Sequence, residues 1–365
     1  MAETANTASL GNKVSEDIFK WLKWQFKTAK DVNFPCETET HGKETHPVDV
    51  VFYYKNPYND KMVYVNTDLK SYTEVSINAN STRNALKSLS MTIECASISE
   101  RWQTFFCHSD NFMISGLLFI YNYDETFKDD FYNKILKTTS LDSLDIPTGQ
   151  MLAVFEPKVV HYLLNVAEDL SKQVMKRKAF DASVYDFYYP NHITARKHHL
   201  DEYAATLECI LSPYMIVKFK SPNYQNDYLV YYQESGNTVD EFIYLIDTLA
   251  SFQLLEEENN ISIILNSVES EDCLVNFTNA KARYAEVWGM KEDDVVFQKI
   301  KAEILPNKHH VYNPMNTRIE NEQGYRVSIP YCPNGYPMCI FVKGKSNTAF
   351  NKALTKANNL ASINN

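Results

Sequence analysis

The stretch from His46 to Tyr72 constrains the fold of this chain more than any other segment. It contains two apolar, aromatic-rich runs, Val48–Tyr54 and Met62–Val65, and between them the polar separator Lys55–Asp60. Proline, asparagine and aspartate in such a separator are typical of a turn, so the two runs predict a β-hairpin. We therefore expect a sheet to be built around this part of the chain.

Charged side chains gather at one end of the predicted hairpin. Asp49 lies at the start of the first run, and Asp68 and Lys70 close the second. Residues two apart in a strand point to the same face, roughly 7 Å apart, so Asp68 and Lys70 should project together. If Asp49 lies across from them, two carboxylates and one ammonium group converge at a place that can bind a metal ion.

The neighbouring segments predict further elements around this hairpin. A helix is expected from Ser15, which would cap it, after a disordered stretch at residues 1–12. Asn33–Glu39 predicts a short first strand, and Ser81–Ala96 predicts a second helix. The nearly unbroken apolar run Phe112–Tyr121 predicts a parallel strand that is covered on both faces.

Pro47-x-Asp49, followed by Asp68-Leu69-Lys70 at the end of the next strand, resembles the PD-(D/E)XK nuclease superfamily, which has the restriction-endonuclease-like fold. The αβββαβ core of that fold, with its mixed sheet, can be laid on residues 11–125. The resemblance implies an α/β (α+β) protein whose N-terminal part is a nuclease-like domain. It also implies a metal-dependent endonuclease, a hydrolase of phosphodiester bonds, with DNA a more probable substrate than RNA.

The resemblance assigns roles to particular residues. Asp49, Asp68 and the carbonyl of Leu69 would bind Mg²⁺ or Mn²⁺, which lowers the pKa of a water and binds a phosphate oxygen. Lys70 would orient or deprotonate the attacking water and stabilise the developing negative charge. Glu16, on the first helix, would either complete the metal site or simply lie in the first turn as a solvated acid; both interpretations are open.

Other interpretations of the hairpin are also open. Asp68 and Lys70 could form an ordinary surface ion pair, which contributes little to stability. Asp49 argues against this, because a charge in an apolar segment is costly unless it is paired or bound to metal. A non-cleaving member of the same fold is a further possibility. So is a non-catalytic α/β adaptor or binding protein that docks a partner ATPase or sensor.

Two more charged segments need an interpretation. Glu156-Pro157-Lys158 is a second acid-x-Lys sequence, but proline suits the first turn of a helix, so Lys158 is expected on a helix and not on a strand. A dense basic strip closes that helix and is either a solvated helix end or a binding strip for nucleic-acid phosphates. It consists of Lys172, Lys176, Arg177 and Lys178.

The length of 365 residues suggests two domains. We expect a PD-(D/E)XK nuclease-like domain at residues 1–185 and an α+β regulatory or interaction domain at 186–365. The second half predicts a hairpin at 214–232, then a helix, a buried strand, another helix and a last hairpin. Five tyrosines from residue 185 onward are expected at an interface with a partner or a second copy, or alternatively in the domain's own core. They are Tyr185, Tyr188, Tyr189, Tyr224 and Tyr228.

The overall charge complicates a nucleic-acid function. The net charge is −10, from 36 basic and 46 acidic residues, whereas a nucleic-acid footprint should be positive. A bound metal ion or a basic partner would offset part of this acidity. The acidity and the lack of a phosphate-binding glycine loop agree with a homo-oligomer or a partner ATPase or sensor. Nucleases of this type commonly act in restriction or anti-phage defence in microbes.

The compartment is predicted from what the sequence lacks. No run approaches 18 apolar residues, so no membrane span and no membrane partner are expected. The polar N-terminus does not resemble a signal peptide. Seven cysteines without a CxxC pair argue against a disulfide framework or a zinc knuckle. These features predict a cytoplasmic protein.

Overall fold

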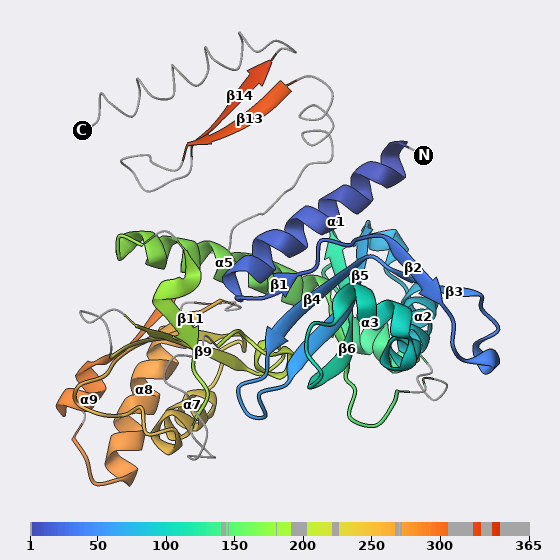
Figure 1. Cartoon of the computed structure of the whole chain (residues 1–365). Helices are drawn as coiled ribbons and strands as arrows, with labels where there is room; N and C mark the ends of the chain where they lie inside the picture. The colour runs from blue at the N-terminus through green and yellow to red at the C-terminus, as the bar shows by residue number, and fades with distance from the viewer. Residues whose placement is uncertain are drawn as a thin grey trace.

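The computed structural model describes residues 2–139, 144, 146–179, 181–190, 203–220, 226–266, 270, 272–291, 293–305, 324–329 and 338–343. Two five-stranded mixed sheets, each covered by helices, dominate this part of the chain (Figure 1). The fold is therefore of the α/β (α+β) class, as the sequence predicts.

The first sheet contains the hairpin from which the sequence analysis starts. Its strands, in spatial order, are β1 (Gln25–Phe26), β4 (Val50–Lys55), β5 (Met62–Tyr72), β6 (Phe112–Asn122) and β7 (Leu152–Phe155). Strand β4 is antiparallel to both of its neighbours, β1 and β5, whereas β5, β6 and β7 run parallel to one another. Helices α2 (Ala79–Ile98) and α3 (Glu100–Phe106) connect β5 to β6. The predicted hairpin and central parallel strand are confirmed.

Helices cover both faces of this sheet. One face packs against α1 (Ala2–Trp21) and α5 (Pro157–Lys176), and the other packs against α2 and α3. Gly116 allows α2 to approach β6 closely, because a Cβ at this position would lie only 3.1 Å from Leu89 Cγ on α2. The close approach fixes α2 over the strand end that carries Asp68.

The second sheet repeats the strand directions of the first. Its spatial order is β8 (Tyr185–Phe187), β9 (Tyr214–Phe219), β10 (Asp227–Tyr232), β11 (Asn260–Leu265) and β12 (Ile300–Ile304). Again the second strand, β9, is antiparallel to both of its neighbours, whereas β10, β11 and β12 run parallel to one another. Helices α7 (Val239–Ser251) and α8 (Asp272–Val287) form the crossovers. The predicted hairpin at 214–232 and the buried strand after it are confirmed.

Short elements complete the described chain. They are β2 (Val32–Pro35), β3 (Thr45–Val48), α4 (Phe131–Lys134), α6 (Leu207–Ile210), α9 (Val295–Gln298), β13 (Gly324–Ile329), β14 (Met338–Lys343) and the 3₁₀ turns η1 (Glu39–His41), η2 (Glu74–Ser76), η3 (Leu136–Thr138) and η4 (Ala182–Val184). Strands β2 and β3 pair with each other, as do β13 and β14, antiparallel in both cases. None of the helices in the described part is both long and apolar enough to cross a membrane.

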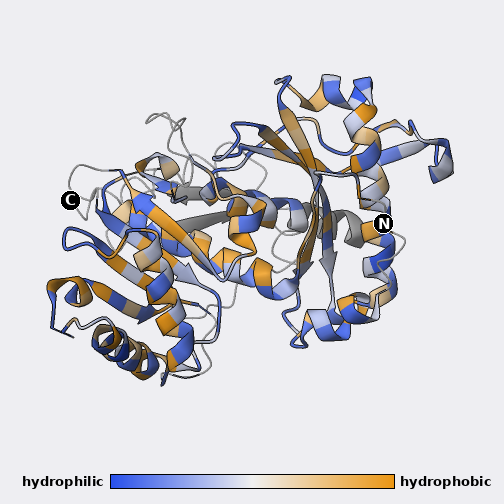
Figure 2. Cartoon of the chain, turned by 90° about the horizontal axis from the view of Figure 1, so that it is seen from below, coloured by the Kyte–Doolittle hydropathy of each residue, from blue (hydrophilic) through white to orange (hydrophobic). Residues whose placement is uncertain are grey.

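Helix α5 lies between the two sheets, and a single buried core joins them. This core takes side chains from β4–β7, from α5 and from β8–β10. Polar contacts follow the same route: Tyr231 on β10 donates to Asp169 Oδ2 on α5 at 2.8 Å, and Asn165 Nδ2 donates to Asn266 Oδ1 at 3.1 Å. Figure 2 shows apolar residues in the strands of both sheets and along the helices that cover them. The domain boundary predicted after residue 185 falls at the first residue of β8.

The first helix differs from the prediction, because it begins at Ala2 and not at Ser15. Ser15 is fully buried inside the helix, where its hydroxyl donates to the carbonyl of Asn12 at 2.8 Å. Gly11 packs against β5, since a Cβ there would be 3.8 Å from Leu69 Cβ. The prediction of disorder was therefore wrong for residues 2–12, which belong to the helix.

The predicted first strand also has a different partner. The segment around Asn33 is extended as β2, but it pairs with β3 outside the central sheet. The outer place in that sheet is taken by β1, whose Gln25 pairs with Tyr53. Pairing of this kind depends on contacts between distant segments and is not encoded in the short run itself.

The predicted interface tyrosines lie mainly in the core. Tyr185, Tyr189 and Tyr228 are buried, and Tyr188 is partly buried; Tyr224 lies outside the described residues. The strands of the second sheet are covered by α5 on one face and by α7 and α8 on the other, so few ring positions remain exposed. The alternative, that these tyrosines line the domain's own core, is correct for the three buried rings.

Candidate active site

The ends of β4 and β5 bring two carboxylates together. The last residue pair of their ladder is Val50 with Thr67. Asp49 precedes Val50 on one chain segment and Asp68 follows Thr67 on the other, so the two residues lie next to each other just beyond the ladder. Asp49 lies in the bend between β3 and β4, where its Oδ2 accepts a hydrogen bond from the backbone N–H of Leu69 at 2.9 Å. This bond holds the Asp49 side chain against β5.

Lys70 lies beside Asp68 on the α2 face of the sheet. Its Nζ is 2.5 Å from Asp68 Oδ1, which makes a close ion pair. The alternation along β5 explains this placement, because Leu69 packs into the core on the opposite face. The structure therefore brings Asp49, Asp68 and Lys70 together, in the arrangement that the sequence analysis describes.

These three side chains line a pocket of about 410 Å³ between the strand ends and α2. The opposite wall is a polar stripe on α2, spaced by three or four residues so that its members share one helix face. It consists of Ser81, Asn84, Ser88 and Thr92. The pocket is thus polar on both sides and lies at the end of the strands.

The Asp49 carboxyl and the Lys70 ammonium group each influence the pKa of the other. Burial raises the pKa of Asp49, and the adjacent carboxyl of Asp68 raises it further, against the opposing effect of the Leu69 N–H and of Lys70. Burial alone would lower the pKa of Lys70, but the charges of Asp68 and Asp49 outweigh this effect and raise it. A raised carboxyl pKa shows that the folded site disfavours its own negative charge, which a divalent cation would offset.

The oxygen atoms present fit a hard divalent cation. Asp49 and Asp68 supply carboxylates, and the N–H and C=O of one strand residue point to the same side, so the Leu69 carbonyl faces the side of Asp49. Mg²⁺ prefers oxygen ligands of this kind and retains several waters. Asp49, Asp68 and Leu69 are therefore the residues that could hold such an ion.

The structure does not bring Glu16 to this pocket. Glu16 lies on α1, which covers the opposite face of the sheet, and its carboxylate forms an ion pair with Lys30. It is not among the residues that line the pocket around Asp68. A role for Glu16 as a metal ligand would require a change in this pairing.

The basic strip lies at the C-terminal end of α5, whereas the N-terminus of α5 follows β7 directly. Since α5 has 20 residues, its two ends are about 30 Å apart. Arg177 is held by Asp227 at 3.5 Å and lies 3.6 Å from the ring centre of Phe219, and Lys172 pairs with Glu168. Lys176 and Lys178 are exposed. The strip is therefore not part of the pocket.

The second acid-x-Lys sequence has the helical geometry that was predicted. Pro157 is in the first turn of α5, so Lys158 extends from a helix while Glu156 precedes it in extended backbone. Both residues border a different pocket, of about 230 Å³, together with His161. Burial raises the pKa of Glu156.

Lys43 lies at the rim of the main pocket, a position that no sequence motif indicated. Its Nζ donates to the hydroxyl of Ser88 at 3.0 Å, and the side chain is exposed. The polar stripe on α2 was the available signal, because Ser88 shares a helix face with Asn84 and Ser81. The loop that carries Lys43 could be located only from the tertiary structure.

A mixed sheet whose antiparallel hairpin ends in Asp49 and Asp68-Leu69-Lys70, with α1 and α2 on opposite faces, defines a restriction-endonuclease-like domain. Residues 1–159 match the family described as the GAPS4 protein PD-(D/E)XK nuclease domain. The N-terminal part of the chain is therefore a domain of the PD-(D/E)XK nuclease superfamily, and the resemblance found in the sequence is confirmed. The match extends from the first residue to the first turn of α5. Comparison with curated proteins found no match.

Proposed function

We propose that the protein is a metal-dependent endonuclease that hydrolyses phosphodiester bonds of DNA. The observation that carries this proposal is the convergence of Asp49, Asp68 and Lys70 in one polar pocket. The family match of residues 1–159 supports the same class of activity.

Each residue has a physical role in the proposed reaction. A divalent cation, Mg²⁺ or Mn²⁺, would lower the pKa of the attacking water and offset the charge that builds on the phosphate. Asp49 and Asp68 orient around that position, and the Leu69 N–H keeps Asp49 in place. Because its pKa is raised, Lys70 stays protonated near neutral pH, which favours it as a donor to the water or to a phosphate oxygen over a role as base.

Several lysines could contact the DNA backbone. Lys43 is nearest to the chemistry, since it is anchored to Ser88 in the pocket wall. Lys176 and Lys178 offer exposed charge farther away, on the basic strip that also includes Lys172 and Arg177. With a net charge of −10, these contacts would be local exceptions on an acidic protein.

The C-terminal half, residues 186–365, has a separate part in the proposal. It would bind a partner ATPase or sensor, or a second copy of the chain, and so restrain or direct the nuclease in a microbial anti-phage defence or restriction system in the cytoplasm. Exposed apolar side chains on α7 and at the end of α8 support an interaction role; Tyr244, Val287 and Trp288 are 71%, 72% and 62% exposed. Measuring the mass of the full chain and of Trp288→Ser in solution, with and without a candidate partner, tests this part.

A second function is favoured by one contact. The ion pair between Lys70 and Asp68 satisfies both charges, and in a non-catalytic member of the fold it would serve only to hold the strand end. Such a protein would be an α/β adaptor or binding protein that docks the partner. It would bind no divalent cation in the pocket and would cleave no substrate.

The decisive experiment incubates the purified chain with plasmid DNA, single-stranded DNA and RNA, in Mg²⁺, Mn²⁺ or EDTA. Cleavage that depends on the metal and disappears in Asp68→Asn and Lys70→Met supports the nuclease. The matched control exchanges Lys55 and Asp60, an ion pair at the other end of the same hairpin, for Met and Asn. Equal cleavage by Asp68→Asn and the control would contradict the assigned site.

A further inference from the structure

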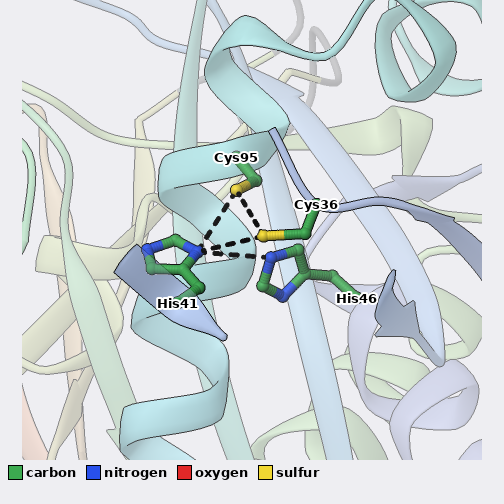
Figure 3. A group of neighbouring side chains, drawn as sticks. All are labelled: Cys36, His41, His46 and Cys95. Carbon is green, nitrogen blue, oxygen red and sulfur yellow. Dashed lines mark hydrogen bonds between the residues drawn. The ribbon is translucent and has the colours of Figure 1, made fainter. Parts of the chain in front are cut away.

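Four potential metal ligands meet beside the nuclease pocket, and the proposed cleavage reaction does not use them. They are Cys36, His41, His46 and Cys95, and their ligand atoms all lie within 4.8 Å of one another (Figure 3). Cys36 follows β2, His41 lies in η1, His46 lies in β3 and Cys95 lies on α2. Four separate segments thus direct one side chain each to one point.

Four of the six separations match the edges of a small tetrahedron. A tetrahedral Zn²⁺ ion with sulfur at about 2.3 Å and nitrogen at about 2.05 Å requires about 3.8 Å between two sulfurs, about 3.6 Å between sulfur and nitrogen and about 3.3 Å between two nitrogens. Cys36 Sγ and Cys95 Sγ are 3.7 Å apart, and His41 Nδ1 lies 3.5 Å and 3.4 Å from them. The two ring nitrogens that face each other, His41 Nδ1 and His46 Nε2, are 3.4 Å apart. The remaining two separations do not exceed 4.8 Å.

The surroundings are also those of a metal ligand set. The other ring nitrogen of His41 is 3.0 Å from Glu94 Oε2, a carboxylate contact that orients a histidine ligand and fixes its tautomer. The hydroxyl of Thr38 lies 3.5 Å from Cys95 Sγ, where it can donate to a thiolate. His46 is fully buried; its Nε2 faces His41, and its Nδ1 has no hydrogen-bond partner among the described residues.

We propose that Cys36, His41, His46 and Cys95 bind one structural Zn²⁺ ion. Two thiolates and two imidazoles in a tetrahedron suit this cation, whereas Mg²⁺ requires oxygen ligands in an octahedron. The site is closed, because all four positions are filled by side chains. It is therefore distinct from the oxygen-rich pocket at Asp49 and Asp68.

The ion would connect the β2–β3 hairpin to the helix that lines the nuclease pocket. His46 precedes Asp49 by three residues, and Cys95 lies on α2, which also carries Ser88. Lys43, which donates to Ser88, lies between the two histidine ligands along the chain. Zn²⁺ would thus fix the approach of the chain to Asp49 and the position of Lys43.

The spacing explains why the sequence alone did not indicate this site. The separation His41-x₄-His46 falls in the range found for zinc ligands. The two cysteines, however, are 59 positions apart, and the last ligand is supplied by a helix. The absence of a CxxC pair therefore excluded a zinc knuckle but not a site assembled by tertiary packing.

The test measures the metal content of the full-length chain, purified with a reductant and without chelator, by inductively coupled plasma mass spectrometry. About one Zn²⁺ per chain is expected in the wild type and in Cys107→Ser, a free half-buried cysteine outside the group. Cys36→Ser and Cys95→Ser should retain less than about one tenth of it, and their unfolding temperature should fall by roughly 10 °C. Replacing the ion with Co²⁺ in the wild type should give the visible absorption of a tetrahedral thiolate complex.

A second measurement applies if the cysteine variants do not fold. In the wild type, alkylation followed by mass spectrometry should show Cys36 and Cys95 protected until a zinc chelator is added, with Cys107 unchanged by the chelator. Three results would overturn the proposal: a wild type that binds no Zn²⁺ after reconstitution, variants that bind as much as the wild type, or a Cys36–Cys95 disulfide that persists in the protein purified with reductant. None of these measurements depends on nuclease activity.

Discussion

The two sheets have the same order and direction of strands but differ at the end of the third strand. In the first sheet, the positions directly beyond the last ladder pair hold Asp49 and Asp68. In the second sheet they hold Pro213 and Gln233, because the last pair there is Tyr214 with Tyr232. The amide of Gln233 donates to the carbonyls of Ile210 and Ser212, so it is used to hold the backbone. The two sheets thus share a strand arrangement, and the side chains at the end of the third strand decide whether that place can form a reactive site.

The lengths of the third strands explain part of this difference. Strand β5 has 11 residues and continues past its ladder with β4, which leaves room for Asp68 and Lys70 over α2. Strand β10 has six residues and ends where its ladder with β9 ends. A strand that extends beyond its antiparallel neighbour leaves backbone groups and side chains available to a ligand.

The largest expected effect tests whether the two sheets can exist apart. A fragment of residues 1–185 should lose cooperative unfolding, because it lacks the side chains of β9 and β10 that cover α5. Circular dichroism during heating measures this. In the full chain, Tyr231→Phe should lower the unfolding temperature by several degrees through the lost bond to Asp169, and Tyr244→Phe, at an exposed ring, should not. A fragment that unfolds cooperatively at the temperature of the full chain would show that the sheets are independent.

The next prediction compares the charged end of β5 with the uncharged end of β10. Asp68→Asn or Lys70→Met should reduce the rate of DNA cleavage by on the order of 100–1,000-fold, because each removes a charged group from the reacting centre. Gln233→Ala, at the corresponding end of β10, should leave the rate per folded molecule unchanged. A fluorescent oligonucleotide assay with excess enzyme measures both. Comparable losses in the two sheets would place the chemistry elsewhere.

A smaller effect concerns stability at the first edge. The raised pKa of Asp49 means that its carboxyl binds a proton more tightly in the folded than in the unfolded chain, so stability falls as pH rises from the unfolded value of 3.8 through the folded value. Asp49→Asn cannot ionise and therefore avoids this loss of stability. The unfolding temperature of the metal-free protein at pH 7 should rise by about 2–4 °C for each kcal/mol gained in the free energy of unfolding. The gain should shrink toward pH 3.8.

Two comparisons check the origin of that gain. Mg²⁺ should stabilise the wild type and not Asp49→Asn, and Asp60→Asn, at an exposed ion pair of the same hairpin, should change neither quantity. If Asp49→Asn lowers the unfolding temperature, the hydrogen bond from Leu69 matters more than the repulsion by Asp68.

The smallest effect compares basic groups near and far from the edge. Lys43→Ala should weaken DNA binding for all sequences alike and reduce the slope of log affinity against log salt by about one. Reversing the charges of Lys176 and Lys178 at the end of α5 should also flatten that slope if the strip binds the backbone. Fluorescence anisotropy in EDTA, at several salt concentrations, measures both. An unchanged slope for the second variant would make the strip a solvated helix end.

The sequence by itself determined the elements whose signals are local. The hairpin around Asn56, the apolar strand β6 and the prolyl start of α5 are encoded by turn residues, by an unbroken apolar run and by the geometry of proline. The acid-x-Lys sequence at Asp68 predicted that Asp68 and Lys70 lie on the same face of the sheet, because side chains alternate along a strand. These features require no knowledge of distant segments.

Only the tertiary structure decided where those elements meet. The alignment of Asp49 with Asp68, the hydrogen bond from the Tyr185 hydroxyl to the carbonyl of Trp21, and the meeting of Cys36 with Cys95 each join residues that are far apart in sequence. Such contacts depend on how the faces of helices and sheets pack against one another, and a short segment of sequence does not specify which other segment will pack against it. For the same reason the sequence did not indicate that α1 begins at Ala2 or that its Gly11 lies against β5.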